Sequence, residues 1–591
     1  MQKEDYMAIK IKSALDILQP YLKRNKWRMI GVFFLVIFVV SIDMLQPIIA
    51  QNAIDNYISV PNPNASSIAL ISLVYFFVVI LAFGLTYYQN ILLQKTGQTI
   101  IKEIRMDLFK HIQSLSLKYF DKNSSGRIIT NVVSDTESLN NFFTDFLANN
   151  IRNFFSLIII IAFMFHLNLT IALYCFLVVP LIIVVSAYFQ KKLRVVNQEM
   201  RSRLSSVIAY LAENLAGMSI IQIFNQEKKQ FREFDKKNTL LLISNKKENK
   251  YILNYFLFTE ALGDFGIAAL IWFGSTPVIR GSVSFGVLFA FIGYIRRFFQ
   301  PINAITTQLS VFQSMLVATE RIATTLNEKP DITEHKDASV PEIHGGVVFQ
   351  NTYLAYSKGL NILKGISLEI KPGDKVGFVG ASGAGKTSLL NLLTRFYDAT
   401  GGVVLIDGKD IKKWPLSDLR CTVGIVQQDI TLFSGTVLDN IRFFRNEISQ
   451  KQVIEVCKLI GADGFISKLP LGYETFLSEK GTTISFGERQ LLSFARVMVF
   501  NPKILILDEA TASLDSETEA ILQNAISKVS EDKTLLVIAH RLSTIQHMDY
   551  IVVLDNGIIV EKGTHHELLK NNGHYSTLHK SGILVEEEVT L

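Results

Sequence analysis

Long apolar segments constrain the fold of this chain more than any other feature. A helix needs about 20 mostly apolar residues to cross the hydrocarbon core of a bilayer. Such segments recur before residue 310, at 28–50, 67–92, 145–166, 169–189, 252–278 and 284–308. They predict an α-helical transmembrane domain of six helices over residues 28–327.

The connections between these segments indicate the orientation of the domain. His166-Leu167-Asn168 separates the third and fourth segments, and a few residues around Arg280 separate the last two, so both pairs form tight hairpins. The connections 93–144 and 190–251 are long, lack proline and keep a helical period, which predicts helices that continue beyond the membrane. Thirteen lysines and arginines lie in 190–251, so both long connections, and with six spans both termini, are predicted to be cytoplasmic.

Composition and the N-terminus argue against several other classes. The chain begins with charged residues, and its first apolar run starts near Met29 and is too long for a signal peptide. We therefore expect a cytoplasmic segment 1–27 followed by a retained membrane helix. The net charge of +6 is modest for 591 residues and is explained by topology, without a nucleic-acid partner. The scattered Cys175, Cys421 and Cys457 predict neither a disulfide framework nor a zinc site.

Ionisable residues inside the apolar segments are candidates for function, because they are costly in a bilayer. They are Asp43, Glu260, Asp264, Arg296 and Arg297. Glu260 and Asp264 share a helix face and could form an acidic patch of a substrate cavity. Asp264 and Arg296 each lie 16 residues from Arg280, so at 1.5 Å per residue they reach a similar depth and could instead form a structural ion pair. Both interpretations stay open, whereas Asp43 is expected to be structural.

A soluble α/β domain is predicted after the polar linker 328–346, over residues 347–591, where β-branched runs alternate with amphipathic helices. The strand 375–379 leads into Gly380-Ala-Ser-Gly-Ala-Gly385-Lys386-Thr387, and a helical run follows. This is a phosphate-binding loop in its expected context between a strand and a helix. Lys386 is expected to reach the β- and γ-phosphates of ATP, and Thr387 is expected to ligate Mg²⁺.

Two further strands end in residues suited to ATP hydrolysis. The strand 503–507 leads into Asp508-Glu509. Asp508 is placed to hold Mg²⁺, and Glu509 to orient or deprotonate the attacking water. The strand beginning at Leu535 ends in His540, which we expect to contact the γ-phosphate.

This order of motifs resembles the ABC transporter superfamily, in its exporter type with the membrane domain and the α/β P-loop nucleotide-binding domain fused in one chain. The resemblance implies that Tyr356 stacks on adenine and that Gln428 contacts Mg²⁺. It further implies a nucleotide-binding set at Gly380, Ser382, Gly383, Gly385, Lys386, Thr387 and Ser388. Residues similar to the family's domain-coupling and dimer-interface segments are Phe120–Arg127, Ser134, Asp135, Glu213, Gly217, Phe224, Glu227, Gln428, Glu479, Gly481 and Ser513–Asp515.

The signature segment departs from the family pattern. In this family the signature, usually Leu-Ser-Gly-Gly-Gln, covers the ATP bound to the partner chain. Here Ser485 and Gly487 are kept, but Phe486 replaces a glycine and Glu488 replaces a glutamine. Because every residue expected at this chain's own ATP is intact, the sequence favours the catalytic half of a heterodimer with a second half-transporter. A homodimer that tolerates a variant signature is the alternative.

The resemblance implies ATP-driven export of an amphipathic or hydrophobic compound, a drug or a lipid, across a bacterial cytoplasmic membrane. Peptide export and an ATP-gated membrane regulator are alternatives, whereas six membrane spans argue against a soluble ABC ATPase. Import is not expected, because importers generally keep the two domains on separate chains. If Glu260 and Asp264 line the cavity, they favour cationic substrates.

Overall fold

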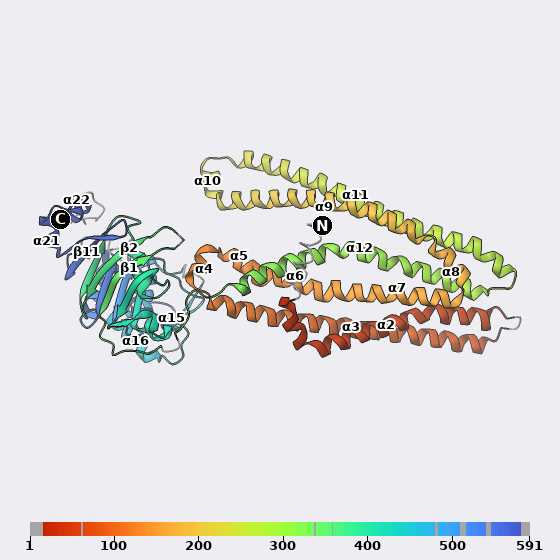
Figure 1. Ribbon diagram of the computed structural model, residues 1–591, viewed down its shortest axis with the longest axis horizontal. Helices are drawn as coiled ribbons and strands as arrows, with labels where there is room; N and C mark the ends of the chain where they lie inside the picture. The colour runs from red at the N-terminus through yellow and green to blue at the C-terminus, as the bar shows by residue number, and fades with distance from the viewer. Residues whose placement is uncertain are drawn as a thin grey trace. The chain divides into compact units, whose positions relative to one another are not determined.

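The protein is described from a computed structural model that covers residues 16–60, 63–335, 338–356, 359–478, 483–508, 516–538 and 545–580. The side chains of residues 303, 305–310, 516 and 517 are not described. The chain divides into two compact units (Figure 1). One consists of Met1–Gln113 and Ser125–Glu328, and the other of Ser114–Ser124 and Lys329–Leu591.

The membrane unit is entirely helical in its described residues. Its long helices are α2 (Lys26–Ala53), α3 (Ala65–Ser114), α7 (Leu147–Leu167), α9 (Val179–Ala216), α11 (Glu227–Ile279) and α12 (Phe285–Asn327), and the short helix α8 (Leu169–Phe176) precedes α9. Five described helical stretches are long and apolar enough to cross a membrane, and they contain the first five predicted segments. The sixth predicted segment lies in α12, where Arg296 and Arg297 interrupt the apolar sequence.

The long helices extend well past a bilayer. α3 has 50 residues and α11 has 53, so at 1.5 Å per residue each is about two and a half times as long as the 30 Å hydrocarbon core is thick. The predicted continuation of helices beyond the membrane is thus confirmed. Short helical pieces complete the connections: α4 (Leu117–Lys122), α5 (Ser125–Thr130), η2 (Asn131–Asp135), α6 (Thr136–Asn141), η3 (Phe142–Phe146), α10 (Met218–Ile223) and, after α2, η1 (Ile54–Ile58).

Helices α2 and α12 are fastened together around Pro47. Proline has no backbone N–H, so the carbonyl of Asp43, four residues earlier in α2, lacks its helical donor. The guanidinium of Arg297 donates to this carbonyl and, over 2.6 Å, to Oε1 of Gln46. The carboxylate of Asp43 forms an ion pair with Arg152 of α7 at 3.0 Å. Asp43 and Arg297 therefore join three helices, which agrees with the structural role expected for Asp43.

The soluble unit contains two larger sheets. One has six strands in the order β12-β11-β3-β10-β9-β6, and the other is antiparallel and has four strands in the order β2-β1-β4-β5. The strands are β1 (Val347–Leu354), β2 (Leu363–Ile370), β3 (Lys375–Val379), β4 (Gly401–Ile406), β5 (Lys409–Asp410), β6 (Val423–Val426), β7 (Gly435–Thr436), β8 (Phe476–Leu477), β9 (Ile504–Asp508), β10 (Thr534–Ile538), β11 (Tyr550–Asp555) and β12 (Ile558–Gly563). Strands β6, β9, β10, β3 and β11 run parallel, as predicted for an α/β domain.

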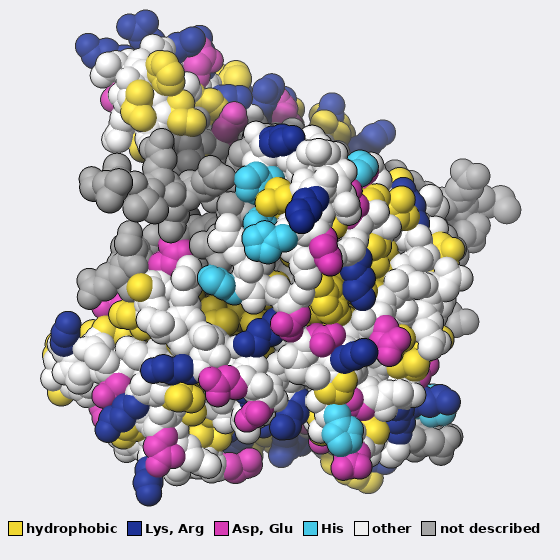
Figure 2. Space-filling view, turned by 90° about the vertical axis from the view of Figure 1, so that its left-hand side faces the viewer, with side chains coloured by type: hydrophobic (Ala, Val, Ile, Leu, Met, Phe, Trp, Pro, Cys, Tyr) yellow, Lys and Arg dark blue, Asp and Glu magenta, His cyan; other side chains and the backbone are white. Residues whose placement is uncertain are grey.

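Helices and buried apolar side chains cover these sheets. The helices are α13 (Lys386–Leu393), α14 (Leu416–Thr422), α15 (Val437–Arg442), α16 (Gln450–Leu459), α17 (Asp463–Ile466), α18 (Phe486–Met498), α19 (Ser516–Val529), α21 (His565–Lys570) and α22 (His574–Lys580). Two buried hydrophobic clusters form the core, one of which includes Trp414 and Phe378. On the outside, basic and acidic side chains are interspersed, with a group of histidines among them (Figure 2).

Candidate functional site

The candidate nucleotide site lies where parallel strands end. Ile538 of β10 is paired with Phe378 of β3 on one side and with Asp508 of β9 on the other, and Val426 of β6 is paired with Leu507. The carboxyl ends of β3, β10, β9 and β6 therefore meet at one edge of the sheet. Since neighbouring strands are about 4.8 Å apart, the end of β9 lies roughly 10 Å from the end of β3. This is the edge at which open α/β sheets bind ligands.

The phosphate-binding loop connects β3 to α13 at this edge. Gly385 is the N-cap of α13 and has a φ of +102°, which residues with a side chain rarely adopt. Gly380 approaches the carbonyl of Leu554 so closely that a side chain there would collide with it. The loop thus presents backbone N–H groups and the N-terminus of α13, a combination that binds phosphate.

Lys386 places a positive charge inside the loop. Its side chain is buried, and its ammonium donates hydrogen bonds to the carbonyls of Gly380, at 2.6 Å, and Ala381, at 3.2 Å. The following Thr387 is exposed on the first turn of α13, whereas Ser388 is buried. The ammonium of Lys386 and the hydroxyl of Thr387 therefore both lie at the start of α13, directly after the glycine loop.

Tyr356 is held beside the phosphate-binding helix. Its hydroxyl donates to Oγ of Ser388 over 2.9 Å. Its ring meets the ring of Tyr397 edge to face, with 4.7 Å between the centroids. The aromatic residue expected to stack on adenine is thus tied both to α13 and to a second tyrosine.

The remaining predicted catalytic residues follow the same strand ends. Asp508 is the last residue of β9, and the exposed Gln428 lies two residues beyond β6. Thr387, Gln428 and Asp508 all bear oxygen ligands, the kind that Mg²⁺ prefers, so these residues fit a magnesium site. Glu479, Gly481, Glu509, Ser513–Asp515 and His540 lie outside the described residues.

The signature segment begins α18 with a capping box. Ser485 is the N-cap residue, and its hydroxyl accepts a hydrogen bond from the backbone N–H of Glu488 at 3.2 Å. In return the Glu488 carboxylate accepts from the backbone N–H of Ser485 at 2.7 Å. The negative charge that replaces the family's glutamine is therefore turned back onto its own helix end. Sequence reasoning missed this role, although Ser-x-x-Glu before an amphipathic run is a recognised helix start.

Phe486 carries the main change at the signature. Its side chain is 37% exposed, and the guanidinium of Arg489 lies 5.6 Å from its ring centroid. Arg489 also donates to the carbonyl of Ile484 at 2.9 Å. Gly487 is buried, and a Cβ there would lie 2.6 Å from Thr518 of α19. A bulky ring thus replaces one glycine, while the close packing of the other is kept.

The cytoplasmic segment α4 packs as part of the soluble unit. Lys118 forms an ion pair with Asp331 at 3.0 Å. The hydroxyl of Tyr397 donates to the carboxylate of Asp121, and burial together with this carboxylate raises the pKa of Tyr397. A chain of contacts therefore runs from Asp121 through Tyr397 to Tyr356. Tyr397 was not predicted, because no local pattern links residues 276 positions apart.

The predicted coupling residues Gly217, Phe224 and Glu227 surround α10. Gly217 separates α9 from α10, Phe224 follows α10, and Glu227 begins α11. Phe224 is 68% exposed. Among the predicted coupling residues earlier in the chain, Asp135 is buried and forms an ion pair with Arg321 of α12 at 3.4 Å, while Ser134 and Gly126 are exposed.

The structure does not form the suggested ion pair between Asp264 and Arg296. Both side chains are exposed, as is Glu260, and no ion pair joins Asp264 to Arg296 in the membrane unit. Gly263 and Gly266 of α11 face α12 instead. A Cβ added to Gly263 would lie 3.5 Å from the side chain of Phe299. The acidic pair therefore flanks the contact between the two helices.

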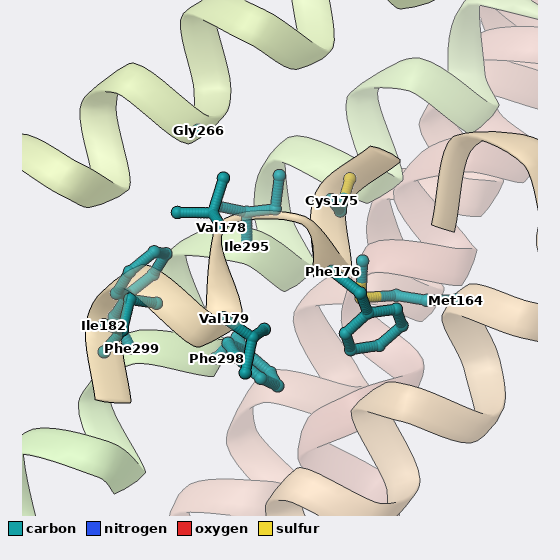
Figure 3. A pocket seen from close by; sticks show the side chains of 10 residues that line it. All are labelled: Met164, Cys175, Phe176, Val178, Val179, Ile182, Gly266, Ile295, Phe298 and Phe299. Carbon is teal, nitrogen blue, oxygen red and sulfur yellow. The ribbon is translucent and has the colours of Figure 1, made fainter. Parts of the chain in front are cut away.

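A small apolar hollow includes Gly266, two residues after Asp264 in α11. It is bounded by Gly266 of α11, by Ile295 and Phe299 of α12, and by Val178 at the break between α8 and α9 (Figure 3). Its volume is about 20 Å³, which is too small for a drug-sized ligand. In a single chain, Glu260, Asp264 and Arg296 are thus placed on exposed helix surfaces and are not gathered in a closed pocket.

Comparisons with known proteins agree with both units. Residues 29–302 match the ABC transporter transmembrane region, and residues 363–512 match the ABC transporter domain. The chain is 37% identical over 521 residues to a probable multidrug resistance ABC transporter ATP-binding/permease protein, YheH of Bacillus subtilis, covering 88% of this chain and 77% of the relative. It is 35% identical over 576 residues to a putative multidrug export ATP-binding/permease protein of Staphylococcus aureus, covering 96% and 99%.

A solved structure extends this likeness to three dimensions. A bacterial Atm1-family ABC exporter with ATP bound superposes with a TM-score of 0.79 at 25% identity, covering 95% of this chain and 99% of that one. ABC exporters work as dimers, and their ATP-binding domains lie on the cytoplasmic side of the membrane. The chain therefore belongs to the ABC transporter family, as a membrane-bound, ATP-hydrolysing half-transporter of the exporter type.

Proposed function

We propose that this protein exports amphipathic or hydrophobic compounds, drugs or lipids, from the cytoplasm or the inner leaflet. The names of its relatives in B. subtilis and S. aureus support multidrug export. The observation that carries the ATP-driven mechanism is the single sheet edge that brings together the phosphate-binding loop, Gln428 and Asp508. ATP bound between two nucleotide-binding domains favours an outward-facing membrane domain, and hydrolysis resets it.

Each residue at the site has a proposed task. Lys386 and the loop from Gly380 to Ser388, including Ser382, Gly383 and Gly385, bind the phosphates, and Tyr356 stacks on adenine. Thr387, Gln428 and Asp508 hold Mg²⁺, which neutralises charge on the phosphates. Glu509 orients or deprotonates the attacking water, and His540 contacts the γ-phosphate.

We further propose that the working unit is a heterodimer. A phenyl ring at Phe486 adds bulk at the start of α18, where the family has a glycine whose backbone faces the partner's ATP. Glu488 is used in the capping box, so the altered contact is attributed mainly to Phe486. The site covered by this signature would hydrolyse ATP slowly, while a partner with an orthodox signature would complete the intact site of this chain. A homodimer is the alternative.

Transport in inside-out vesicles tests the exported substrate class. We expect ATP-dependent accumulation of a fluorescent amphipathic cation and its loss in Lys386→Ala. If Glu260 and Asp264 face the cavity, Asp264→Asn lowers uptake of the cation but not of a neutral dye, while the protein remains folded. Loss of both dyes with normal ATPase activity would contradict an acidic patch. Absence of any ATP-dependent dye or labelled-lipid transport by the complete dimer would contradict the proposed function.

A further inference from the structure

A large apolar pocket lies among α2, α3 and the start of α7, away from the nucleotide site. Its volume is about 500 Å³. Ile30 and Phe34 contribute from α2, Leu93 and Gly97 from α3, and Phe143 and Ala148 from η3 and α7. The polar lining residue Thr96 donates its hydroxyl to the carbonyl of Leu92 at 2.7 Å. The pocket therefore offers almost nothing to water, which needs polar partners, and suits a hydrocarbon ligand.

Small residues bring the walls of this pocket close together. Gly97 of α3 packs so tightly on η3 that an added Cβ would lie 2.7 Å from Thr144, and Ala148, at the start of α7, is buried. The π-helical turn η3 lies on the same wall, and such turns are frequently found at functional sites. The pocket is open on the side where Phe34 is 64% exposed, so a ligand could enter it from the surrounding membrane.

The depth of the pocket corresponds to the cytoplasmic leaflet. Trp27 is 76% exposed at the cytoplasmic start of α2, a position typical of the membrane interface. The α2 residues that line the pocket run from Met29 to Val36, so they begin next to Trp27 and extend about 10 Å toward the bilayer centre. This range of depth matches the part of the inner-leaflet acyl chains that lies next to the headgroups.

Positive charge lies at the cytoplasmic mouth of the pocket. Lys26 precedes Ile30 by one helical turn and therefore lies on the same face of α2. Lys26 and Arg28 are exposed, and among the described residues neither forms an ion pair. The nearby Arg24 is paired with Asp107, and Glu103 accepts from Asn25. Lys26, which also lies 5.4 Å from the ring centroid of Trp27, is thus placed where a lipid headgroup would be, whereas Arg28 lies on another face of α2.

We propose that this pocket binds one acyl chain of an anionic phospholipid of the cytoplasmic leaflet, with its phosphate beside Lys26. The lipid fills a space that would otherwise lack dispersion contacts. It also bridges α3 to α2 and α7. This binding does not depend on which compound the protein exports.

Lipid retention by the purified dimer tests the proposal. The protein is reconstituted in vesicles that contain equal amounts of phosphatidylglycerol and phosphatidylethanolamine and is then extracted in mild detergent. Native mass spectrometry identifies the lipids that remain bound. We expect retained phosphatidylglycerol, several-fold less of it in Ala148→Phe, and no change in Ala69→Phe, a matched change at an exposed alanine near the outer end of α3. Equal retention in Ala148→Phe and the unchanged protein would overturn the proposal.

Variants that remove a positive charge test the proposal even if Ala148→Phe does not fold. Because one basic residue near the membrane surface contributes about 1 kcal/mol, Lys26→Gln should lower the preference for phosphatidylglycerol about fivefold. Arg28→Gln, at a residue on another face of α2, should lower it less. Equal retention of both lipids by the unchanged protein would overturn the anionic preference. If Ala148→Phe weakened dimerisation while leaving lipid retention unchanged, the pocket would belong to a contact with the partner chain, and the lipid assignment would be wrong.

Discussion

At the scale of single residues, the altered signature is a change of shape more than of charge. Glu488 looks unfavourable near a triphosphate when only its charge is considered. In the structure its carboxylate binds the backbone N–H of Ser485, the role that a glutamine at this position also fills. Phe486 has no such local explanation beyond its contact with Arg489. The structure therefore assigns different consequences to the two substitutions.

Glu488 variants should separate capping from charge. Glu488→Ala removes the acceptor for the N–H of Ser485, so we expect faster amide hydrogen exchange in the first turn of α18. Glu488→Gln keeps an acceptor and should leave exchange in this turn nearly unchanged. Glu455→Ala, at an exposed glutamate of α16, serves as the control. Equal acceleration by Glu488→Ala and Glu488→Gln would contradict the capping role.

Tyr397 should link nucleotide binding to the cytoplasmic segment α4. Tyr397→Phe keeps the ring beside Tyr356 but removes the hydrogen bond to Asp121. We expect nearly normal ATP affinity and a lower number of substrate molecules transported per ATP hydrolysed. Asp121→Asn removes the charged acceptor and should have a similar effect, and the double variant should be no worse than either alone. Additive losses would show that the two residues act separately.

At the scale of secondary-structure elements, a proline in one helix explains an arginine in another. Pro47 leaves the carbonyl of Asp43 without its helical donor, and Arg297 supplies one. Tyr294, one turn before, donates to the carbonyl of Met44 at 2.9 Å. The contact between α2 and α12 is therefore polar at its centre, although apolar side chains surround it.

Arg297 and Arg296 provide a matched pair of variants. Arg297→Met leaves the acceptors on Asp43 and Gln46 unpaired, which costs about 1–3 kcal/mol for a buried polar group. We expect a clear decrease in the thermal unfolding temperature of the detergent-solubilised protein. Arg296→Met changes the neighbouring exposed side chain and should have little effect. The reverse order of effects would contradict this account of the contact between α2 and α12.

At the scale of the whole molecule, sequence patterns predicted the units better than the contacts within them. Apolar length identified the membrane helices, and the glycine loop between β3 and α13 identified the nucleotide site, because both features are local. The Asp264–Arg296 ion pair, one of the two interpretations left open, does not form, and there is a physical reason. Equal distance from a hairpin turn fixes the depth of two residues in the membrane but not the direction of their side chains, because each residue turns a helix by about 100°. Here Gly263 and Gly266 face α12, and Asp264 points to one side of this contact. The bond between Tyr397 and Asp121 could not be predicted, since only the tertiary fold brings them together.

We propose that this chain has an intact ATP site that needs the signature of a different half-transporter. The direct test is the ATPase activity of this chain purified alone in lipid, together with its Glu509→Gln variant and a measurement of mass. We predict that the chain alone binds ATP but hydrolyses it slowly or not at all, and that an orthodox partner restores turnover dependent on Glu509. A homodimer of this chain alone with rapid, Glu509-dependent hydrolysis would contradict the claim.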